Sequence, residues 1–158
     1  MGVRLLVFLL QIITDNFARA SELIESGYGI IGSMKTIRQE YKIKAPVGKI
    51  WEALTVPAVI EKWGGGPSKM VAEELSEFEL WGGDVHGNNI EVVRNKKLVQ
   101  DWYSGDWEKP SRATFTLTPE DGGTLVTLVH ENVPDEEEKD IAYGWNRYYL
   151  GQIKKLLE

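Results

Sequence analysis

Few side chains in this sequence have the type and spacing that acid–base or metal chemistry requires. His86 and His130 are the two histidines of the 158 residues, and they are too far apart for the His-Glu-x-x-His spacing of a helical zinc site. Together with Asp101, they are the acid or base candidates that a cyclase or hydrolase would need. The sequence therefore favours no metal, and acid–base catalysis remains an alternative.

Other catalytic motifs are missing from the sequence. It contains no Cys, which excludes a thiol nucleophile and a disulfide framework. Residues 64–66 (GGG) lack the following Lys-Ser/Thr of a phosphate loop, and no Gly-x-Ser-x-Gly elbow occurs. Residues 136–138 (EEE) point in different directions on a helix and do not converge on one cation. We therefore expect a protein without a cofactor, and a binding function ahead of an enzymatic one.

The overall charge excludes several classes of partner. The formal net charge is −6 and the sequence pI is about 5.1. A nucleic-acid binder needs a basic face to displace counterions, and docking on anionic lipid also needs positive charge. We expect no nucleic acid and no membrane partner. The lack of Cys is compatible with a cytoplasmic location.

Residues 1–33 differ from the rest of the chain. Residues 3–13 (VRLLVFLLQII) form an apolar run that is shorter than the roughly 20 residues needed to span a bilayer. Three interpretations stand: a mis-assigned start, with Met34 as the true first residue; an amphipathic N-terminal helix; and a signal peptide. We predict an extension at 1–33 that is dispensable for folding, followed by one domain at 34–158.

The elements that must position any site follow from hydropathy patterns. Residues 34–44 alternate as a half-buried strand, and two short amphipathic helices follow, beginning near Pro46 and Pro57. A meander of alternating strands occupies residues 77–130, and an apolar stripe from Ile141 to Leu156 predicts a long last helix. Acidic residues open that helix and lysines close it, as its dipole favours. A sheet with one apolar face needs this helix as its cover.

Large residues concentrate on the faces that should meet between sheet and helix, where they either fill the core or line a cavity for a small apolar ligand. Polar Gln100, Thr114 or Tyr149 would orient such a ligand. The cavity-lining candidates are Trp51, Trp63, Phe78, Leu80, Gln100, Trp102, Phe115, Leu117, Leu128, Trp145 and Tyr149.

Three ordered motifs carry a family resemblance: residues 83–87 (GDVHG), 97–102 (KLVQDW) and 144–149 (GWNRYY). With residues 50–55 (IWEALT), they make the chain resemble the C-terminal domain of activators of the heat-shock protein 90 ATPase. The resemblance covers residues 36–157. The sequence departs from the family at Leu75-Ser76, where Gly-Gly is common, and at Val56, where Asp is common.

The resemblance implies an α+β fold of the START-like helix-grip superfamily. In this fold a curved antiparallel β-sheet, with two short helices after its first strand, wraps around a long C-terminal helix. It also implies a non-enzymatic, chaperone-associated domain whose partner is a heat-shock protein 90-type chaperone. The full eukaryotic activator has a separate N-terminal domain, and residues 1–33 are too short to form it. The resemblance therefore predicts the fold of this chain more strongly than it predicts a co-chaperone activity.

Overall fold

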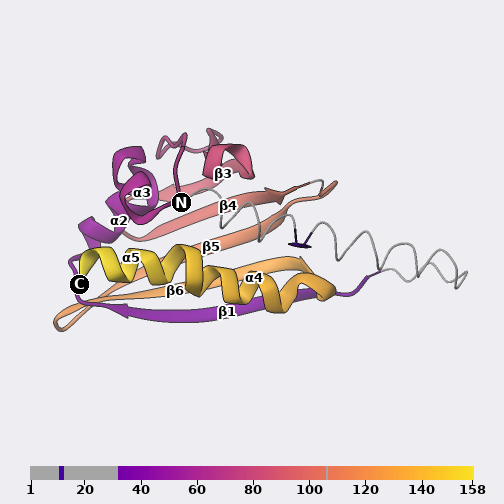
Figure 1. The fold of residues 1–158 in the computed structure, drawn as a ribbon. Helices are drawn as coiled ribbons and strands as arrows, with labels where there is room; N and C mark the ends of the chain where they lie inside the picture. Colours follow the sequence, from indigo (N-terminus) through magenta and orange to yellow (C-terminus); the bar gives the residue numbers. More distant parts are fainter. Residues whose placement is uncertain (1–10, 13–31, 106) are drawn as a thin grey trace, which may run out of the picture.

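One antiparallel sheet of six strands forms the body of the domain (Figure 1). The computed structural model describes residues 11–12, 32–105 and 107–158. The strand order is β1-β6-β5-β4-β3-β2, with every neighbouring pair antiparallel. The strands are β1 (Met34–Ile43), β2 (Glu77–Leu80), β3 (Val85–Val93), β4 (Lys97–Ser104), β5 (Ser111–Glu120) and β6 (Gly123–Pro134).

Alternation of buried and more exposed side chains, clearest in β5 and β6, gives the sheet one inner face. In β5, Ala113, Phe115 and Leu117 are buried, while the threonines between them are more exposed. In β6, the alternate positions Thr124 to His130 are buried in the same way. The period of two that predicted these strands is confirmed, because successive side chains of a strand point to opposite faces.

Two short helices connect β1 to β2 and cover one end of the inner face. They are α2 (Val47–Thr55) and α3 (Pro57–Trp63). Pro57 suits the first turn of α3 because its fixed φ fits the helix and its missing N–H would have no partner there. Gly64 ends α3 in the left-handed conformation, with φ of 102°. The predicted pair of helices is thereby confirmed.

The C-terminal helix lies along the sheet (Figure 1) and is interrupted by one wide turn. It consists of η2 (Asp135–Glu137), α4 (Glu138–Gly144), the π-helical turn η3 (Trp145–Tyr149) and α5 (Leu150–Leu157). The backbone N–H of Leu150 donates to the carbonyl of Trp145, and the side-chain Nε2 of Gln152 donates to the carbonyl of Arg147 at 2.8 Å. A Cβ on Gly151 would lie 1.9 Å from the carbonyl oxygen of Asn146, so the wide turn requires glycine there. The sequence pattern predicted the helix but not this turn.

The π-helical turn also shifts the buried stripe of the helix. Trp145, Tyr149 and Ile153 are buried as predicted, whereas Leu156 is 40% exposed. An uninterrupted helical period would have continued the stripe to Leu156. The extra residue in the wide turn changes the phase of α5, and Leu150 is buried instead.

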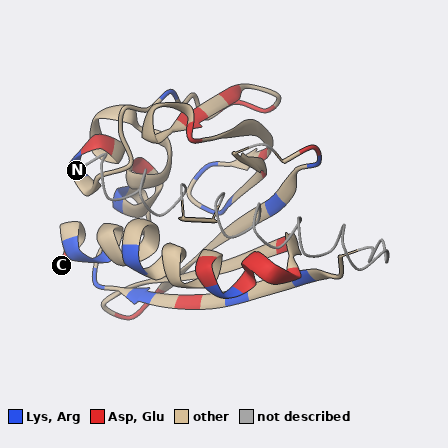
Figure 2. Cartoon of the chain, turned by 45° about the vertical axis from the view of Figure 1, so that its right-hand side comes forward, with Lys and Arg blue, Asp and Glu red and all other residues tan. Residues whose placement is uncertain are grey.

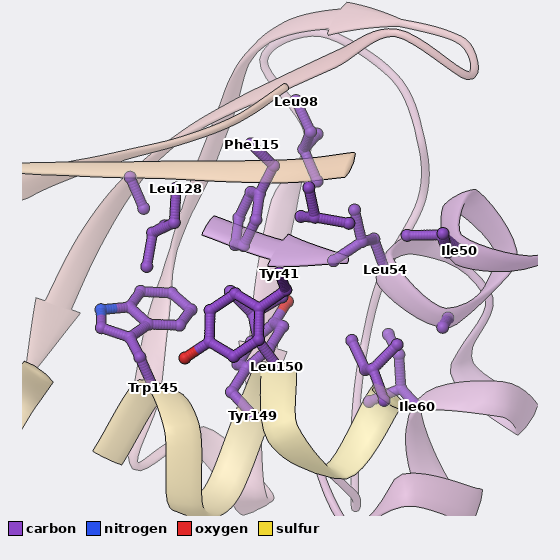
Figure 3. Packing of buried hydrophobic residues seen from close by; sticks show 14 of the residues in the cluster. Tyr41, Ile50, Leu54, Ile60, Leu98, Phe115, Leu128, Trp145, Tyr149 and Leu150 are labelled. Atoms are coloured by element: carbon purple, nitrogen blue, oxygen red, sulfur yellow. The ribbon is translucent and has the colours of Figure 1, made fainter. Parts of the chain in front are cut away.

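The core lies between the sheet and these helices (Figure 3). Trp145, Tyr149 and Leu150 reach up from the C-terminal helix toward Phe115 and Leu128 of the sheet. The core closes at one end with Ile50, Leu54 and Ile60 from the two short helices. The architecture is the curved antiparallel sheet around a long C-terminal helix that the sequence predicted.

Charges on the C-terminal helix follow its dipole (Figure 2). Asp and Glu gather at its start, in η2 and the first turn of α4, and Lys154 and Lys155 lie in its last turn. Negative charge is favoured near the N-terminal end of a helix and positive charge near the C-terminal end. None of the helices in the described ranges has the length and apolar character that crossing a lipid bilayer requires.

Leu75, one of the two departures from the family pattern, has an unusual backbone. Its φ is 65°, in the left-handed region, and its side chain is 79% exposed. Glycine reaches this region without the clash that a Cβ introduces. The backbone therefore explains why glycine suits this position.

Of the predicted N-terminal helix, only Gln11 and Ile12 lie within the described residues, where they are helical. The remainder of the apolar run at 3–13 lies outside them. Ile12 is buried. A domain boundary at residue 34 remains a proposal.

Candidate functional site

A small cavity of about 70 Å³ opens between the sheet and the C-terminal helix. Six aromatic side chains line it: Trp81, Trp102, Trp107, Trp145, Tyr148 and Tyr149. The other lining residues are Ile12, Val85, Ser104, His130, Ile141 and Gly144. The wall is almost entirely apolar, which suits an apolar ligand and excludes a strongly charged one.

The cavity wall is rigid because its aromatic rings pack on each other. The ring centroids of Trp102 and Trp145 are 4.7 Å apart, and those of Trp145 and Tyr149 are 4.9 Å apart. Tyr149 also packs against Trp63 at 4.6 Å. Tilted and edge-on rings at these distances are attractive beyond the area that they bury. The shape of the cavity is therefore set largely before any ligand arrives.

His130 lies in the cavity wall with both ring nitrogens hydrogen-bonded. The indole Nε1–H of Trp145 donates to Nδ1 at 3.0 Å. An indole nitrogen can only donate, so Nδ1 must carry no proton, and Nε2 of the neutral ring carries it instead. Nε2 lies 2.7 Å from Oγ of Ser111 and donates to it, and Ser111 in turn donates to the Trp102 carbonyl at 3.3 Å.

Burial lowers the pKa of His130 to about 3. No carboxylate offsets the loss of hydration, so the ring stays neutral at physiological pH. A neutral histidine with both nitrogens already committed has no site left to take a proton from a substrate. His130 therefore orients Trp145 and Ser111 in the cavity wall.

Among the described residues of the wall, Tyr149 carries the one fully buried polar side-chain atom that lacks a hydrogen-bond partner. Its side chain is 1% exposed, and its hydroxyl is buried without a hydrogen bond. Burial raises the pKa of Tyr149, so the phenol stays protonated and can both donate and accept. A buried hydroxyl without a partner is destabilising, and a ligand with one polar atom would relieve that deficit.

Gln100, a predicted ligand-orienting residue, is fully occupied elsewhere. Its Oε1 accepts from Nε1 of Trp102 at 3.0 Å, and its Nε2 donates to Oδ1 of Asn89 at 2.8 Å. Asn89 then donates to the Val71 carbonyl and to Ser76. This buried chain of hydrogen bonds fixes the Trp102 indole and ties β3 and β4 to the loop before β2.

The three acid–base candidates do not come together. The strand pairing places three residues side by side on the inner face of the sheet: Gln100 of β4, Ala113 of β5 and His130 of β6. Asp101 pairs with Arg112 on the opposite face, where the two form an ion pair at 2.9 Å. His86 is exposed and stacks on Tyr103 on that outer face, with centroids 5.4 Å apart. One sheet therefore separates His130 from the other two candidates.

The predicted cavity residues divide into two groups. Trp102, Trp145 and Tyr149 line the cavity. The other predicted residues lie in the buried core around it: Trp51, Trp63, Phe78, Leu80, Gln100, Phe115, Leu117 and Leu128. The partly exposed Thr114 is on the outer face of β5, with its side chain away from the cavity.

Several cavity residues were not predicted as site residues from the sequence. Trp81 follows β2 in a 3₁₀ turn, and Trp107 lies in the loop between β4 and β5. Neither position belongs to a periodic pattern. The sequence feature that could have pointed to these residues is the high number of Trp residues. The chain has six, and four of them line the cavity. Among the described residues, no group of three or more metal-ligating side chains comes together.

The fold and this cavity define a START-like helix-grip domain. A family model described as "Activator of Hsp90 ATPase homolog 1-like protein" matches residues 44–158, and the chain belongs to this family. The mouse "Activator of 90 kDa heat shock protein ATPase homolog 2" is 28% identical over 114 residues, which is 71% of this chain and 34% of the mouse protein. The chain therefore spans about a third of the length of that relative.

Two solved structures show the same fold. A Mesorhizobium loti protein, MLL2253, is 26% identical with a TM-score of 0.66 and covers 78% of this chain and 96% of its own. A structure described as an HSP90 activator from Plasmodium falciparum is 22% identical with a TM-score of 0.69, covering 80% and 96%. Both superpose over nearly the whole of their own chains.

Proposed function

We propose that the chain is a non-enzymatic binding domain whose aromatic cavity takes a small apolar molecule with one hydrogen-bonding group. The observation that carries this proposal is the buried hydroxyl of Tyr149, a cavity-lining residue, because this hydroxyl has no partner among the described residues and the wall is almost entirely apolar. Aromatic walls supply affinity, and a single polar group supplies orientation.

The chemistry of the wall limits the ligand. A charged ligand would lose its hydration without gaining an ion pair, because the lining contains no Lys, Arg, Asp or Glu among the described residues. Both ring nitrogens of His130, the histidine of the described lining, are already hydrogen-bonded, which supports binding rather than turnover.

Native mass spectrometry of the freshly purified chain and titration with the neutral dye N-phenyl-1-naphthylamine test this proposal. We expect one dye molecule per chain with enhanced emission. Tyr149→Phe should weaken binding several-fold, whereas Tyr143→Phe should not, because Tyr143 is exposed and lies outside the cavity. A protein that carries no ligand and binds neither this dye nor other small apolar molecules would contradict the proposal.

Association with an Hsp90-type chaperone is the second candidate, and family membership favours it. The acidic start of the C-terminal helix (Figure 2) is a surface that can steer a basic partner. The proposal concerns this domain alone, since the match covers only about a third of the length of the relatives named as activators.

The test is the ATPase rate of an Hsp90-type chaperone with and without the chain of residues 1–158. We expect stimulation that falls at least fivefold when Glu136 and Asp140 are both changed to Lys. The matched control changes Glu73 and Glu74 to Lys, which alters the net charge equally at another exposed site. An unchanged ATPase rate together with no complex in sedimentation would contradict this candidate.

A further inference from the structure

The outer edge of β1 has no backbone partner among the described residues. The strand order places β1 at one end of the sheet and β2 at the other. The β2 edge is partly covered, because the backbones of Lys69 and Glu79 exchange two hydrogen bonds of 2.9 Å there. β1 is longer, with ten residues against four, and in the described part of the chain it pairs with β6 alone. An open edge of this length is a template for an additional strand.

Two contacts show which backbone groups of β1 point to the open edge. The carbonyl of Ile43 is directed at β6, since a Cβ on Gly123 would collide with its oxygen. The carbonyl of the preceding residue, Lys42, instead accepts a hydrogen bond from Nζ of Lys154. Successive residues of an antiparallel strand direct their N–H and C=O groups to opposite edges. The N–H and C=O of Glu40, two residues before Lys42 in the same regular pairing, therefore also point to the open edge.

A groove of about 710 Å³ lies between β1 and the later part of the C-terminal helix. Residues 39–42 form one wall, and residues of η3 and α5 form the other. The side-chain Nε2 of Gln39 donates to the Ala142 carbonyl at 2.9 Å, which ties the strand to the helix at this wall. The groove is far larger than the aromatic cavity, and it runs beside a strand whose backbone is open. An extended peptide segment fits such a place.

Positive charge predominates in the groove, and Figure 2 shows blue segments along β1 and at the C-terminal end of the helix. The charged lining residues are Lys42, Arg147, Lys154 and Lys155 against Glu40 and Glu158. Lys154 pairs with Glu158 at 2.8 Å. No ion pair among the described residues involves Lys42, Arg147 or Lys155, and all three are exposed. In a chain of net charge −6, this groove therefore attracts a negatively charged partner.

We infer that this groove binds an extended acidic peptide segment of a partner protein, which pairs with β1 as an additional strand. Backbone hydrogen bonds to the open edge supply affinity. Alternate side chains of an added strand point to one face, so acidic residues at every second position of the peptide meet Arg147 and Lys155 together. The site shares no lining residue with the aromatic cavity, and the inference is independent of the ligand proposed there.

A second copy of this chain suits the edge less well than an acidic segment does. β1 (MKTIRQEYKI) carries three basic residues and one acidic residue. Pairing two β1 strands would bring an excess of positive charge together, and like charges across neighbouring strands are destabilising. The charge of the edge therefore favours an acidic partner over self-association.

Fluorescence anisotropy of the full chain with a fluorescein-labelled hexapeptide of alternating Glu and Thr tests this inference. Binding should saturate at one peptide per chain and weaken as the salt concentration rises. Changing Arg147 and Lys155 together to Glu should weaken binding about fivefold or more. The matched control changes Arg94 and Lys96 to Glu, which alters the net charge equally at exposed positions outside the groove.

Two further measurements test the backbone pairing. Glu40→Pro removes an N–H that points to the open edge and leaves the pairing with β6 in place, so it should weaken binding about fivefold. Glu40→Gln keeps this N–H and should bind at least as tightly as the wild type. A hexapeptide that is N-methylated at every residue keeps its charge but has lost its backbone donors, so it should bind the wild type poorly. Circular dichroism checks that each variant is folded.

Each outcome supports or overturns the inference. Weaker binding by the double variant and by Glu40→Pro, and of the N-methylated peptide, with unchanged binding by the Arg94 and Lys96 control, supports it. Equal binding of the N-methylated peptide and its parent would overturn the strand pairing, and no binding of the parent peptide would overturn the groove as a peptide site. A wild type that sediments as a dimer and becomes monomeric in Glu40→Pro would show that a second copy occupies the edge, which also overturns the inference.

Discussion

The two ends of the sheet–helix interface are packed in different ways. At one end, Ile50, Leu54 and Ile60 of the short helices meet Leu150 and Ile153 of α5, and all five are completely buried. These five side chains are pure hydrocarbon, and we call this the solid end. At the other end, aromatic rings from the sheet and the C-terminal helix surround the cavity, and buried polar atoms hold them. We call this the hollow end.

The difference indicates how one interface can serve stability and binding together. Close packing of branched aliphatic residues leaves no room and stabilises the fold through burial and dispersion. Large flat rings that are fixed by hydrogen bonds hold their positions without filling all of the space. The solid end therefore maintains the architecture, and the hollow end leaves the space in which the proposed ligand would lie.

The largest expected effects come from truncating one residue at each end. Trp145→Ala should lower the free energy of unfolding by about 3–5 kcal/mol, and Leu54→Ala by about 2–5 kcal/mol.

Milder variants sharpen the comparison in a urea titration. Trp145→Phe keeps most of the apolar area but leaves Nδ1 of His130 without its donor, so it should lower stability by about 1–3 kcal/mol. Leu54→Met should change it by less than about 1.5 kcal/mol. A tolerated Trp145→Ala, below about 1 kcal/mol, would show that the hollow end does not depend on this residue.

The hollow end should also make the protein sensitive to acid. The pKa of His130 is about 3 in the folded chain and about 6.5 in the unfolded chain. Below pH 6.5 the unfolded chain therefore binds a proton that the folded chain does not, and stability falls as the pH approaches 3. Between pH 7 and pH 5, His130 should account for a loss of about 2 kcal/mol.

Comparing the wild type with His130→Gln isolates this effect, since the other titrating groups are common to both proteins. The wild type should lose more stability on acidification than the variant does. His86→Gln is the control and should behave like the wild type, because His86 is exposed. Equal pH dependence of the wild type and His130→Gln would show that the His130 pKa is not depressed.

Adding volume should have opposite effects at the two ends. Ala53 in α2 is completely buried at the solid end, so Ala53→Leu should lower stability by about 1–3 kcal/mol through overpacking. Val85 lines the cavity, so the additional methylene of Val85→Leu should be neutral or stabilise the protein by up to about 0.8 kcal/mol. Thermal melts of both variants measure this contrast. Similar losses for both would mean that the cavity is no larger than the gaps at the solid end.

Most of the solid end could be predicted from the sequence, except for Leu150, which is buried in place of the predicted Leu156, and the hollow end only in part. Ile50 and Leu54 follow a helical period, and Phe115 and Leu128 follow a strand period, so their inward faces were predictable. The role of His130 depends on the register of β5 on β6 and on the distance to Trp145, neither of which leaves a periodic signal. The π-helical turn depends on the missing Cβ of Gly151, which a pattern of apolar residues does not reveal.

The central claim is that the hollow end binds a small apolar molecule through the hydroxyl of Tyr149. Titration calorimetry with 1-naphthol and with 1-methylnaphthalene, on the wild type and on Tyr149→Phe, tests it most directly. The two ligands share a shape and differ in their hydroxyl group, so their affinity ratio reports a hydrogen bond. We predict that the wild type prefers 1-naphthol by up to about tenfold, as one net hydrogen bond allows, and that Tyr149→Phe shows no preference. An equal preference in both proteins, or no binding of either ligand, would contradict the claim.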